Sequence, residues 1–378
     1  MSSRPTVATV HVDALQHNLR RIQRLLHSAR REPGARPKII SVVKANAYGH
    51  GATQVALALE GAGADGFACA DLEEGVALRE AGVTRPILIF GALSVSDLSH
   101  VFSHGLTPTV STPSAARAVE AAAAERNVVI GCHLKVDTGM NRLGFRHDNL
   151  GRTVPDVVAM PHLRIEAVYT HFATADQPEA PWLDEQRHRF DRATAALGAL
   201  GIRGVQRHAA NSAALLRDGR TWYEAVRPGL LLYGLVPPPL AAADLDLRPA
   251  LSLSSRIVAV KGVRPGEGTS YGLSWQDDLP RTIAIVPAGY ADGLDTRLAG
   301  RGHVLLRGRR HPIVGAVCMD MIMVDVTGVD VSPGDEVVLI GRQGDQEITA
   351  REIASVIGTI PWEVVCRLGS RIRRIYQE

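Results

Sequence analysis

The strongest constraint on the fold is a repeated alternation between short apolar runs and segments of helical periodicity. The intervening segments include ATQVALALEGAG, LEEGVALREAG, SAARAVEAAAAE and EQRHRFDRATAALGAL. A strand followed by a helix, repeated eight times, predicts an α/β fold with an N-terminal, TIM-like (β/α)8 barrel. A doubly wound open sheet gives similar alternation, but the count favours closure. The eight predicted strands cover residues 39–43, 66–70, 87–90, 108–110, 129–136, 165–170, 205–209 and 223–226.

The sequence changes character after the last of these strands. A proline-rich stretch, VPPPLAAADLDLRPAL, is followed by β-type runs with turn signals such as RPGEG and SPGDE between them. One helix, TAREIASVIG, interrupts the runs. We therefore predict a barrel domain over residues 1–245 and a mostly antiparallel β domain over residues 246–378. At the start of the chain, Asp13 as N-cap and a leucine-rich pattern predict a helix over residues 13–31.

Composition limits the kinds of partner. The 378 residues carry a formal net charge of only +3, spread along the chain, which does not indicate a nucleic-acid or membrane surface. The expected partner is a small molecule. No apolar stretch reaches the length of a signal peptide core or a membrane span, so we expect a cytoplasmic protein. The four cysteines show no CxxC spacing, which predicts buried thiols rather than a metal site.

Chemically distinctive residues follow the predicted barrel strands, where barrel enzymes place their active sites. Lys44 directly follows the apolar run IISVV and precedes the polar turn ANAYGHG. A lysine amine against an apolar wall loses solvation as a cation, which favours the neutral nucleophile needed to form an imine. The other residues at such positions are Asp137, Arg142, His171, Asn211, Ser212 and Arg227.

The run VVKANAYGHG around Lys44 resembles the cofactor-lysine signature of the alanine racemases. The resemblance continues, in order, through KVDTGMNRLG, THFATAD, HAANSAA, RPGLLLYG, TSYG, AGYADG and CMD, and so covers nearly the whole chain. It implies a pyridoxal 5'-phosphate enzyme whose cofactor is bound to Lys44 through an imine. The implied activity is the interconversion of L-alanine and D-alanine, which supplies D-alanine for peptidoglycan synthesis.

Loops after the seventh and eighth barrel strands often bind phosphate through backbone N–H groups. Ser212, Gly229 and Leu230 occupy these loops, and the resemblance assigns them to the cofactor phosphate, with Tyr48 and Asn211 nearby.

The resemblance also places Arg227 opposite the pyridine nitrogen of the cofactor and His171 against its ring. A guanidinium donates hydrogen bonds without giving up a proton, so the ring nitrogen would stay unprotonated. His208 is a candidate to hold Arg227, although it fits equally well as an ordinary buried histidine.

Racemisation removes a proton from one face of Cα and returns one to the other, which two bases on opposite faces can do. Lys44 can serve one face, and the resemblance points to Tyr271 in TSYG for the other. A free phenol has a pKa of about 10, so Tyr271 would need cationic or hydrogen-bonding neighbours to act as a base. In relatives this tyrosine comes from the other subunit of a head-to-tail homodimer.

Three further residues are assigned to the substrate by resemblance. Arg142 and the backbone of Met319 would bind the alanine carboxylate, and Tyr290 would narrow the entrance. Lys135 resembles a lysine that is carbamylated in some relatives to position the arginine. The sequence predicts no metal site. His100 and His104 are four residues apart, but they have no carboxylate partner.

The chain departs from the family pattern near its C-terminus. Ser370 stands where some relatives have a tyrosine that reaches the phosphate, and Arg373 replaces a common proline. The alternatives are a barrel-type amino-acid decarboxylase, a racemase of broader range, and a cofactor carrier without turnover. Decarboxylases of this architecture usually place a cysteine near the cofactor, and carriers typically lack the C-terminal β domain, so both fit this chain less well.

Overall fold

The structure is a computed structural model that describes residues 4–28, 36–91 and 98–378. The described chain forms two compact units. The barrel unit comprises Leu15–Ala47 and Ala52–Arg248, and the β unit comprises Met1–Ala14, Tyr48–Gly51 and Pro249–Glu378. The division into folding domains at residues 245 and 246 stays a prediction.

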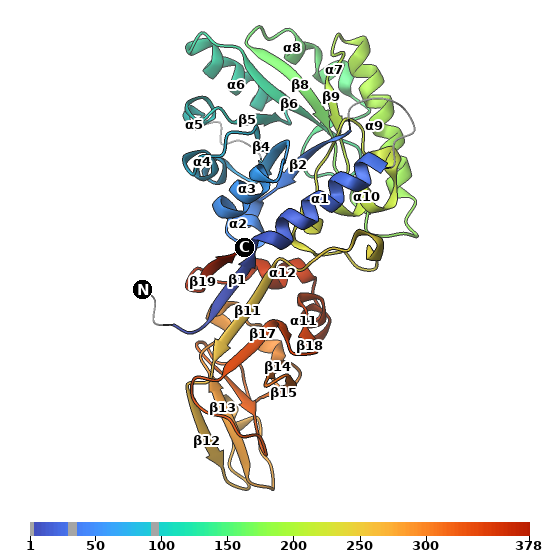
Figure 1. Cartoon of the computed structure of the whole chain (residues 1–378). Helices are drawn as coiled ribbons and strands as arrows, with labels where there is room; N and C mark the ends of the chain where they lie inside the picture. The colour runs from blue at the N-terminus through green and yellow to red at the C-terminus, as the bar shows by residue number, and fades with distance from the viewer. Residues whose placement is uncertain (1–3, 29–35, 92–97) are drawn as a thin grey trace. The chain divides into compact units, whose positions relative to one another are not determined.

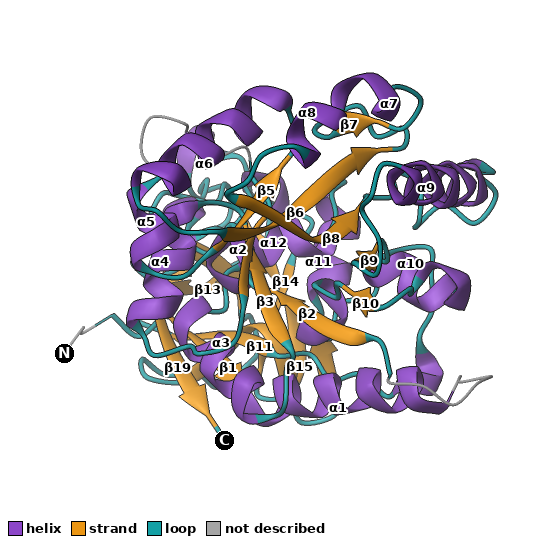
Figure 2. Ribbon diagram, turned by 90° about the horizontal axis from the view of Figure 1, so that it is seen from above, coloured by secondary structure: helices purple, strands orange, loops and turns teal. Residues whose placement is uncertain are grey.

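Eight parallel strands close into a ring in the barrel unit (Figure 2). The ring closes where Ala225 pairs with Lys38, and this closure excludes an open sheet. The strands, in ring order, are β2 (Lys38–Val42), β3 (Gly66–Cys69), β4 (Ile87–Ile89), β5 (Thr107–Val110), β6 (Ile130–Asp137), β8 (Leu163–Tyr169), β9 (Gln206–His208) and β10 (Ala225–Val226). The predicted (β/α)8 barrel is thereby confirmed, including the strands predicted at 108–110 and 223–226, which contain few strongly apolar residues. The last strand is shorter than expected because Tyr223 adopts a left-handed φ of 49°, which strand backbone does not allow.

Helices surround the barrel strands (Figure 2). The first, α1 (Val12–Ser28), begins one residue before the predicted N-cap, so Asp13 lies in its first turn and the capping prediction was wrong. The reason is that β1 leads directly into the helix without an extended cap residue. The predicted end of this helix, at residue 31, lies outside the described residues. The others are α3 (Ala52–Gly61), α4 (Leu72–Glu80), α5 (Ser99–Ser103), α6 (Pro113–Glu125), α7 (Leu150–Thr153), α8 (Pro155–Val158), α9 (Trp182–Ala199) and α10 (Ser212–Arg217).

The β unit contains a mostly antiparallel sheet, as predicted (Figure 1). Its strands are β1 (Val7–His11), β11 (Leu251–Arg256), β12 (Ala259–Val263), β13 (Arg281–Val286), β14 (His303–Leu306), β15 (Arg309–Val314), β16 (Ile322–Asp325), β17 (Glu336–Gln343), β18 (Gln346–Ile348) and β19 (Arg373–Gln377). Sequence analysis missed β1, which pairs antiparallel with β11 and parallel with β19. The predicted helix is α11 (Ala350–Ile357), and a second one, α12 (Pro361–Cys366), was also missed.

Two further features bear on the sequence predictions. None of the four cysteines forms a disulfide; Cys69 and Cys132 are buried as predicted, whereas Cys318 is half-buried and Cys366 is exposed. Cys366 ends α12, and the expectation of four buried thiols was therefore wrong for half of them. Within the described ranges, no helix has both the length and the apolar composition needed to cross a membrane.

Candidate functional site

Lys44 lies at the carboxyl end of β2, immediately before an unusual turn. Residues 45–48 all have φ between 52° and 54°, so the short segment α2 (Lys44–Tyr48) is largely left-handed. Left-handed backbone costs roughly 1–2 kcal/mol per non-glycine residue, so surrounding contacts must hold it. The Asn46 side chain accepts a hydrogen bond from the Ala52 N–H at 2.9 Å, and the Asn46 N–H donates to Glu74 at 3.3 Å. These contacts fix the direction in which the chain leaves Lys44.

Tyr48 ends this segment and is half-buried. Burial raises the pKa of its hydroxyl, so the phenol is protonated near neutral pH and can donate a hydrogen bond.

Lys135 lies within a cluster of cationic side chains in the barrel. It projects from β6 and is only 5% exposed. Burial, followed by the charges of Arg142, Arg227 and Lys44, lowers its pKa to about 8, against an opposing effect of Asp137. Three cationic side chains that act on one buried amine create a site for an anionic ligand.

Arg142 lies in the loop after β6 and is exposed. The Asp137 carboxylate organises this loop by accepting hydrogen bonds from the N–H groups of Gly139 at 2.9 Å, Met140 at 3.0 Å and Asn141 at 3.1 Å. One carboxylate therefore fixes the backbone that carries the arginine.

Arg227 follows β10 and is 3% exposed. Its guanidinium donates to the Thr170 carbonyl at 2.7 Å, the Ala209 carbonyl at 2.9 Å and Nδ1 of His208 at 2.8 Å. Burial lowers its pKa to about 10, which still leaves the group charged near neutral pH. The predicted contact between His208 and Arg227 is thus present in the structure.

His171 follows β8 and belongs to the same group of side chains. Its Nδ1 lies 3.4 Å from a guanidinium nitrogen of Arg227, and Gln186 of α9 donates to its carbonyl at 3.1 Å. Burial, followed by the charges of Arg227 and Arg142, lowers its pKa well below the usual value, so the imidazole is neutral.

Two residues near Arg227 were missed by sequence analysis. Tyr169 is buried, stacks on His208 with ring centroids 4.7 Å apart, and lies beneath the Arg227 guanidinium at 5.3 Å. His133 is the second, and its Nδ1 lies 3.0 Å from Nε2 of His208. The sequence could have indicated His133, because it lies two residues from Lys135 on β6 and the two side chains therefore share a face of the strand.

Four of the predicted phosphate residues lie in the barrel unit, namely Asn211, Ser212, Gly229 and Leu230. The Ser212 hydroxyl is buried and accepts hydrogen bonds from the N–H groups of Gly229 at 3.1 Å and Leu231 at 3.3 Å. With both lone pairs engaged, its O–H remains available to donate. The Leu230 N–H has no acceptor in the described part of the chain. Asn211 caps α10 by accepting from the Ala214 N–H at 2.9 Å.

The β unit brings Tyr271, Tyr290 and Met319 together around Cys318. Next to Tyr271, the Ser270 hydroxyl lies 3.4 Å from the Cys318 sulfur, and the Tyr290 N–H donates to the Cys318 carbonyl at 3.0 Å. All three side chains are exposed in the single chain, Tyr271 by 76%.

Asp292 supports this region and was also missed, although it lies within AGYADG. Its carboxylate is fully buried and accepts hydrogen bonds from the Gly289 N–H at 2.8 Å, Arg4 at 2.5 Å and Arg371 at 2.8 Å. Arg371 also donates to the Met319 carbonyl at 3.2 Å. The buried carboxylate thus orders both backbone segments.

The two departures from the family pattern lie beside this arginine. Ser370 is exposed, and Arg373 begins β19, where it pairs with Val7.

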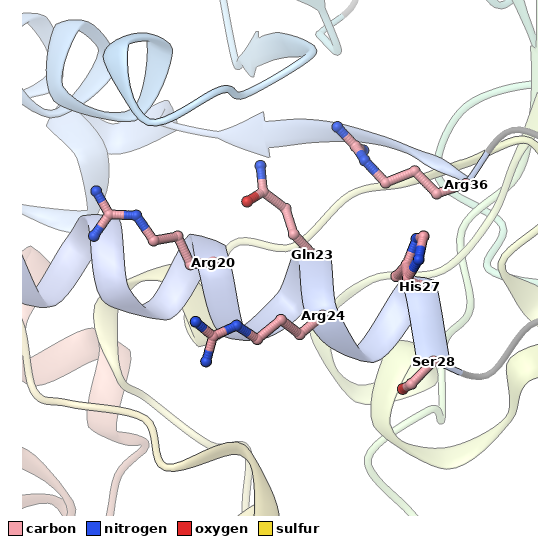
Figure 3. A pocket seen from close by; sticks show the side chains of 6 residues that line it. All are labelled: Arg20, Gln23, Arg24, His27, Ser28 and Arg36. Atoms are coloured by element: carbon pink, nitrogen blue, oxygen red, sulfur yellow. The ribbon is translucent and has the colours of Figure 1, made fainter.

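Two other groups of residues hold none of the predicted site residues. A basic hollow of about 610 Å³ runs along α1, with Arg36 on the segment that leads into β2 (Figure 3). His100 and His104 lie with ring centroids 5.3 Å apart. In the described ranges, no group of three or more His, Cys, Asp or Glu side chains could hold a metal ion.

Known proteins with the same combination of units are similar to this chain along its whole length. Residues 10–237 match the family model "Alanine racemase, N-terminal domain", and residues 250–376 match "Alanine racemase, C-terminal domain". The alanine racemase of Symbiobacterium thermophilum is 41% identical over 374 residues, which are 99% of this chain and 97% of that protein. That of Carboxydothermus hydrogenoformans is 42% identical over 375 residues, which are 99% of this chain and 100% of that protein.

A solved structure shows the same similarity. Alanine racemase from Bacillus anthracis, crystallised with bound L-Ala-P, aligns with a TM-score of 0.93 and 36% identity, covering 100% of this chain and 96% of that one. A barrel with a lysine-bearing strand end and a second β unit is an architecture of pyridoxal-phosphate-dependent enzymes, and the matched families place the chain among the amino-acid isomerases of that type. Within that class, the chain belongs to the alanine racemase family, whose substrate is alanine.

Proposed function

We propose that the chain interconverts L-alanine and D-alanine by a two-base reaction at the carboxyl end of its barrel. One observation carries the proposal. Five side chains from separate parts of the sequence interact electrostatically around a buried region: Lys44, Lys135, Arg142, His171 and Arg227. Such a concentration of cationic and neutral nitrogen groups suits a ligand with a phosphate and a carboxylate.

The donor set supports binding of pyridoxal 5'-phosphate. Lys44 would hold the cofactor covalently, Arg227 would donate to its ring nitrogen, and the neutral His171 would lie against the ring. The free O–H of Ser212 and the free N–H of Leu230 would donate to phosphate oxygens. When bound, the cofactor withdraws electron density from the substrate Cα and so makes its proton acidic.

Further phosphate contacts are proposed for Tyr48, Asn211 and Gly229. The Tyr48 hydroxyl is protonated and can donate. The Gly229 N–H already donates to Ser212 at 3.1 Å, so its contact with phosphate requires that bond to be shared or broken. The Asn211 side chain is engaged in capping α10, which leaves its amide nitrogen to donate.

Substrate binding is proposed for Arg142 together with the backbone N–H of Met319, which has no acceptor within the described residues. Both groups can donate to a carboxylate. Tyr290 would narrow the entrance. Lys135 suits carbamylation, because an amine with a pKa of about 8 is partly neutral in mildly alkaline solution. Its lone pair would bond to the carbon of CO2 and one proton would leave, giving an anion for Arg142.

Proton transfer is proposed for Lys44 on one face of Cα and Tyr271 on the other. Because Tyr271 is 76% exposed in the single chain, it can enter the barrel of a second copy, and we propose a head-to-tail homodimer in which it does so. Within this proposal the barrel domain spans residues 1–245, and the domain that supplies Tyr271 spans residues 246–378. A role in peptidoglycan synthesis and a cytoplasmic location belong to the same proposal.

The test combines two variants with a chiral assay and hydrogen exchange in D2O. Lys44→Ala should lose both the cofactor's visible absorption and racemisation. Tyr271→Phe should keep the absorption and lose racemisation in both directions. It should still exchange the Cα hydrogen of the enantiomer whose proton faces Lys44, but not of the other. Exchange of both enantiomers at the wild-type rate in Tyr271→Phe would refute the two-base assignment.

A further inference from the structure

A chain of nitrogen-to-nitrogen hydrogen bonds runs away from Arg227 into the barrel. Arg227 lies 2.8 Å from Nδ1 of His208, and Nε2 of His208 lies 3.0 Å from Nδ1 of His133. The members come from the end of β10, from β9 and from β6, so three barrel strands contribute. All the donors and acceptors between them are buried or part-buried.

The direction of each bond in this chain follows from the chemistry of its first member. A guanidinium can only donate hydrogen bonds, so Nδ1 of His208 must be unprotonated and must accept the hydrogen bond from Arg227. A neutral His208 then carries its proton on Nε2 and donates to Nδ1 of His133. His133, neutral in turn, carries its proton on its own Nε2. In the opposite tautomer of His208, the proton on Nδ1 would face an N–H group of Arg227, and the hydrogen bond between them could not form.

His133 also lines a cavity of about 240 Å³. The other lining residues include Lys38, Gly66, Thr107 and Gln206, each of which is the first residue of its strand, so the cavity lies at the amino end of the barrel. His133 is half-buried, and its Nε2 has no partner among the described residues. Water in the cavity can therefore accept its proton in a hydrogen bond.

We propose that His133 is a positioning residue for Arg227 and acts through His208. Its Nδ1 accepts a hydrogen bond from the Nε2–H of His208, which keeps Nδ1 of His208 unprotonated and able to accept a hydrogen bond from the guanidinium. The inference rests on the proposed function, in which Arg227 faces the cofactor ring. His133 itself touches neither cofactor nor substrate in this scheme. Its loss would let His208 change tautomer and release Arg227 from a fixed orientation.

Two substitutions separate this role from simple packing. His133→Leu fills much of the volume without an acceptor, whereas the Oδ1 of His133→Asn can stand near the position of Nδ1. We expect kcat for alanine to fall about tenfold in His133→Leu, with KM changed less than about twofold, because a buried donor is left unsatisfied. His133→Asn should recover most of the loss. His162→Leu, at a histidine paired with Glu120 at 2.8 Å, is the matched control and should keep wild-type kcat.

The direct readout is the tautomer of His208, followed by 15N NMR of histidine-labelled protein without cofactor. The wild type should show a bare Nδ1 and a protonated Nε2, and His133→Leu should show a mixture. A protonated Nδ1 in the wild type overturns the proposal even if His133→Leu does not fold. So does a His133→Leu enzyme with wild-type kcat. Failure of the wild type to bind cofactor or racemise alanine would instead contradict the proposed function, and the NMR result would not depend on it.

Discussion

At the scale of single residues, burial decides the protonation of the imidazoles in the barrel. His133, His171 and His208 all have a pKa lowered first by burial and then by the charge of Arg227, and for His133 the value falls to about 4. Arg142, Lys135 and Lys44 add to the effect on His171, and His133 adds to that on His208. Each imidazole is therefore a neutral donor and acceptor at the pH of the cell.

These lowered pKa values predict a loss of stability in mild acid. Below pH about 6.5 the unfolded chain binds protons at these histidines that the folded chain does not, so unfolding becomes easier as pH falls toward about 4. Each such histidine contributes about 1.4 kcal/mol of unfolding free energy per pH unit in this window. Urea unfolding of the wild type and His133→Asn across the window measures it, and the variant should show the shallower dependence. Parallel curves would contradict the assignment for His133.

A pair of buried serines offers a sharper test of hydrogen bonding. Ser212→Ala removes the acceptor for two backbone N–H groups and should lower the unfolding free energy by about 1–3 kcal/mol and weaken cofactor binding. Ser41 is equally buried, but its hydroxyl has no partner among the residues that the structure describes. Ser41→Ala should therefore leave stability unchanged or raise it. Denaturant unfolding and cofactor titration of both variants measure the contrast, and equal losses would show that packing rather than hydrogen bonding dominates.

Sequence could predict site residues only where strand-end position or family resemblance marked them. Lys44 and Arg227 were found in this way, and the structure brings both into one electrostatic group. His133 and Tyr169 lie inside the strands predicted at 129–136 and 165–170, where a polar residue looks like any other until the neighbouring strands are known. Asp292 was missed because its partners, Arg4 and Arg371, are far from it in sequence.

At the scale of elements, the loop after β6 depends on one glycine. Gly144 has φ of 125°, and a Cβ at this position would come within 2.7 Å of the Asp137 nitrogen. Gly144→Ala should therefore disturb the backbone that leads to Arg142, raise KM for alanine and lower stability by about 1–3 kcal/mol.

The neighbouring Gly151 provides the control for this substitution. It lies in α7, its Cβ would meet nothing within 4 Å, and its φ is ordinary. Gly151→Ala should keep KM and raise stability by up to about 1 kcal/mol, because alanine favours helix. Steady-state kinetics and thermal unfolding check both variants. An unchanged KM in Gly144→Ala would separate the loop from substrate binding.

Element types were predicted well where periodicity extended over a full turn or strand. All eight barrel strands appeared, and their order around the ring follows the chain. The strand Val7–His11 was missed because its partners lie more than 200 residues away, and five residues carry little periodicity alone. The helix Pro361–Cys366 is too short to show a repeating apolar face, although Pro361 in its first turn is a helix-start signal.

At the scale of the whole molecule, the proposed catalytic groups fall into two separate sets. Lys44, Arg142 and Arg227 belong to the barrel unit, and Tyr271 and Met319 belong to the β unit. The second set is exposed in the single chain, which is costly for large side chains unless another surface covers them. In a head-to-tail dimer each active site would draw one set from each chain.

This arrangement predicts that two inactive variants restore activity when mixed. Lys44→Ala and Tyr271→Phe chains, unfolded and refolded together, should form hybrid dimers with one site that carries both substitutions and one that carries neither. Random pairing makes about half of the dimers hybrids, so the mixture should regain roughly a quarter of wild-type activity. Refolded Lys44→Ala alone and Tyr271→Phe alone are the controls, and both should stay inactive. If Lys44 and Tyr271 acted within one chain, every site in the mixture would lack one of them, and no activity would return.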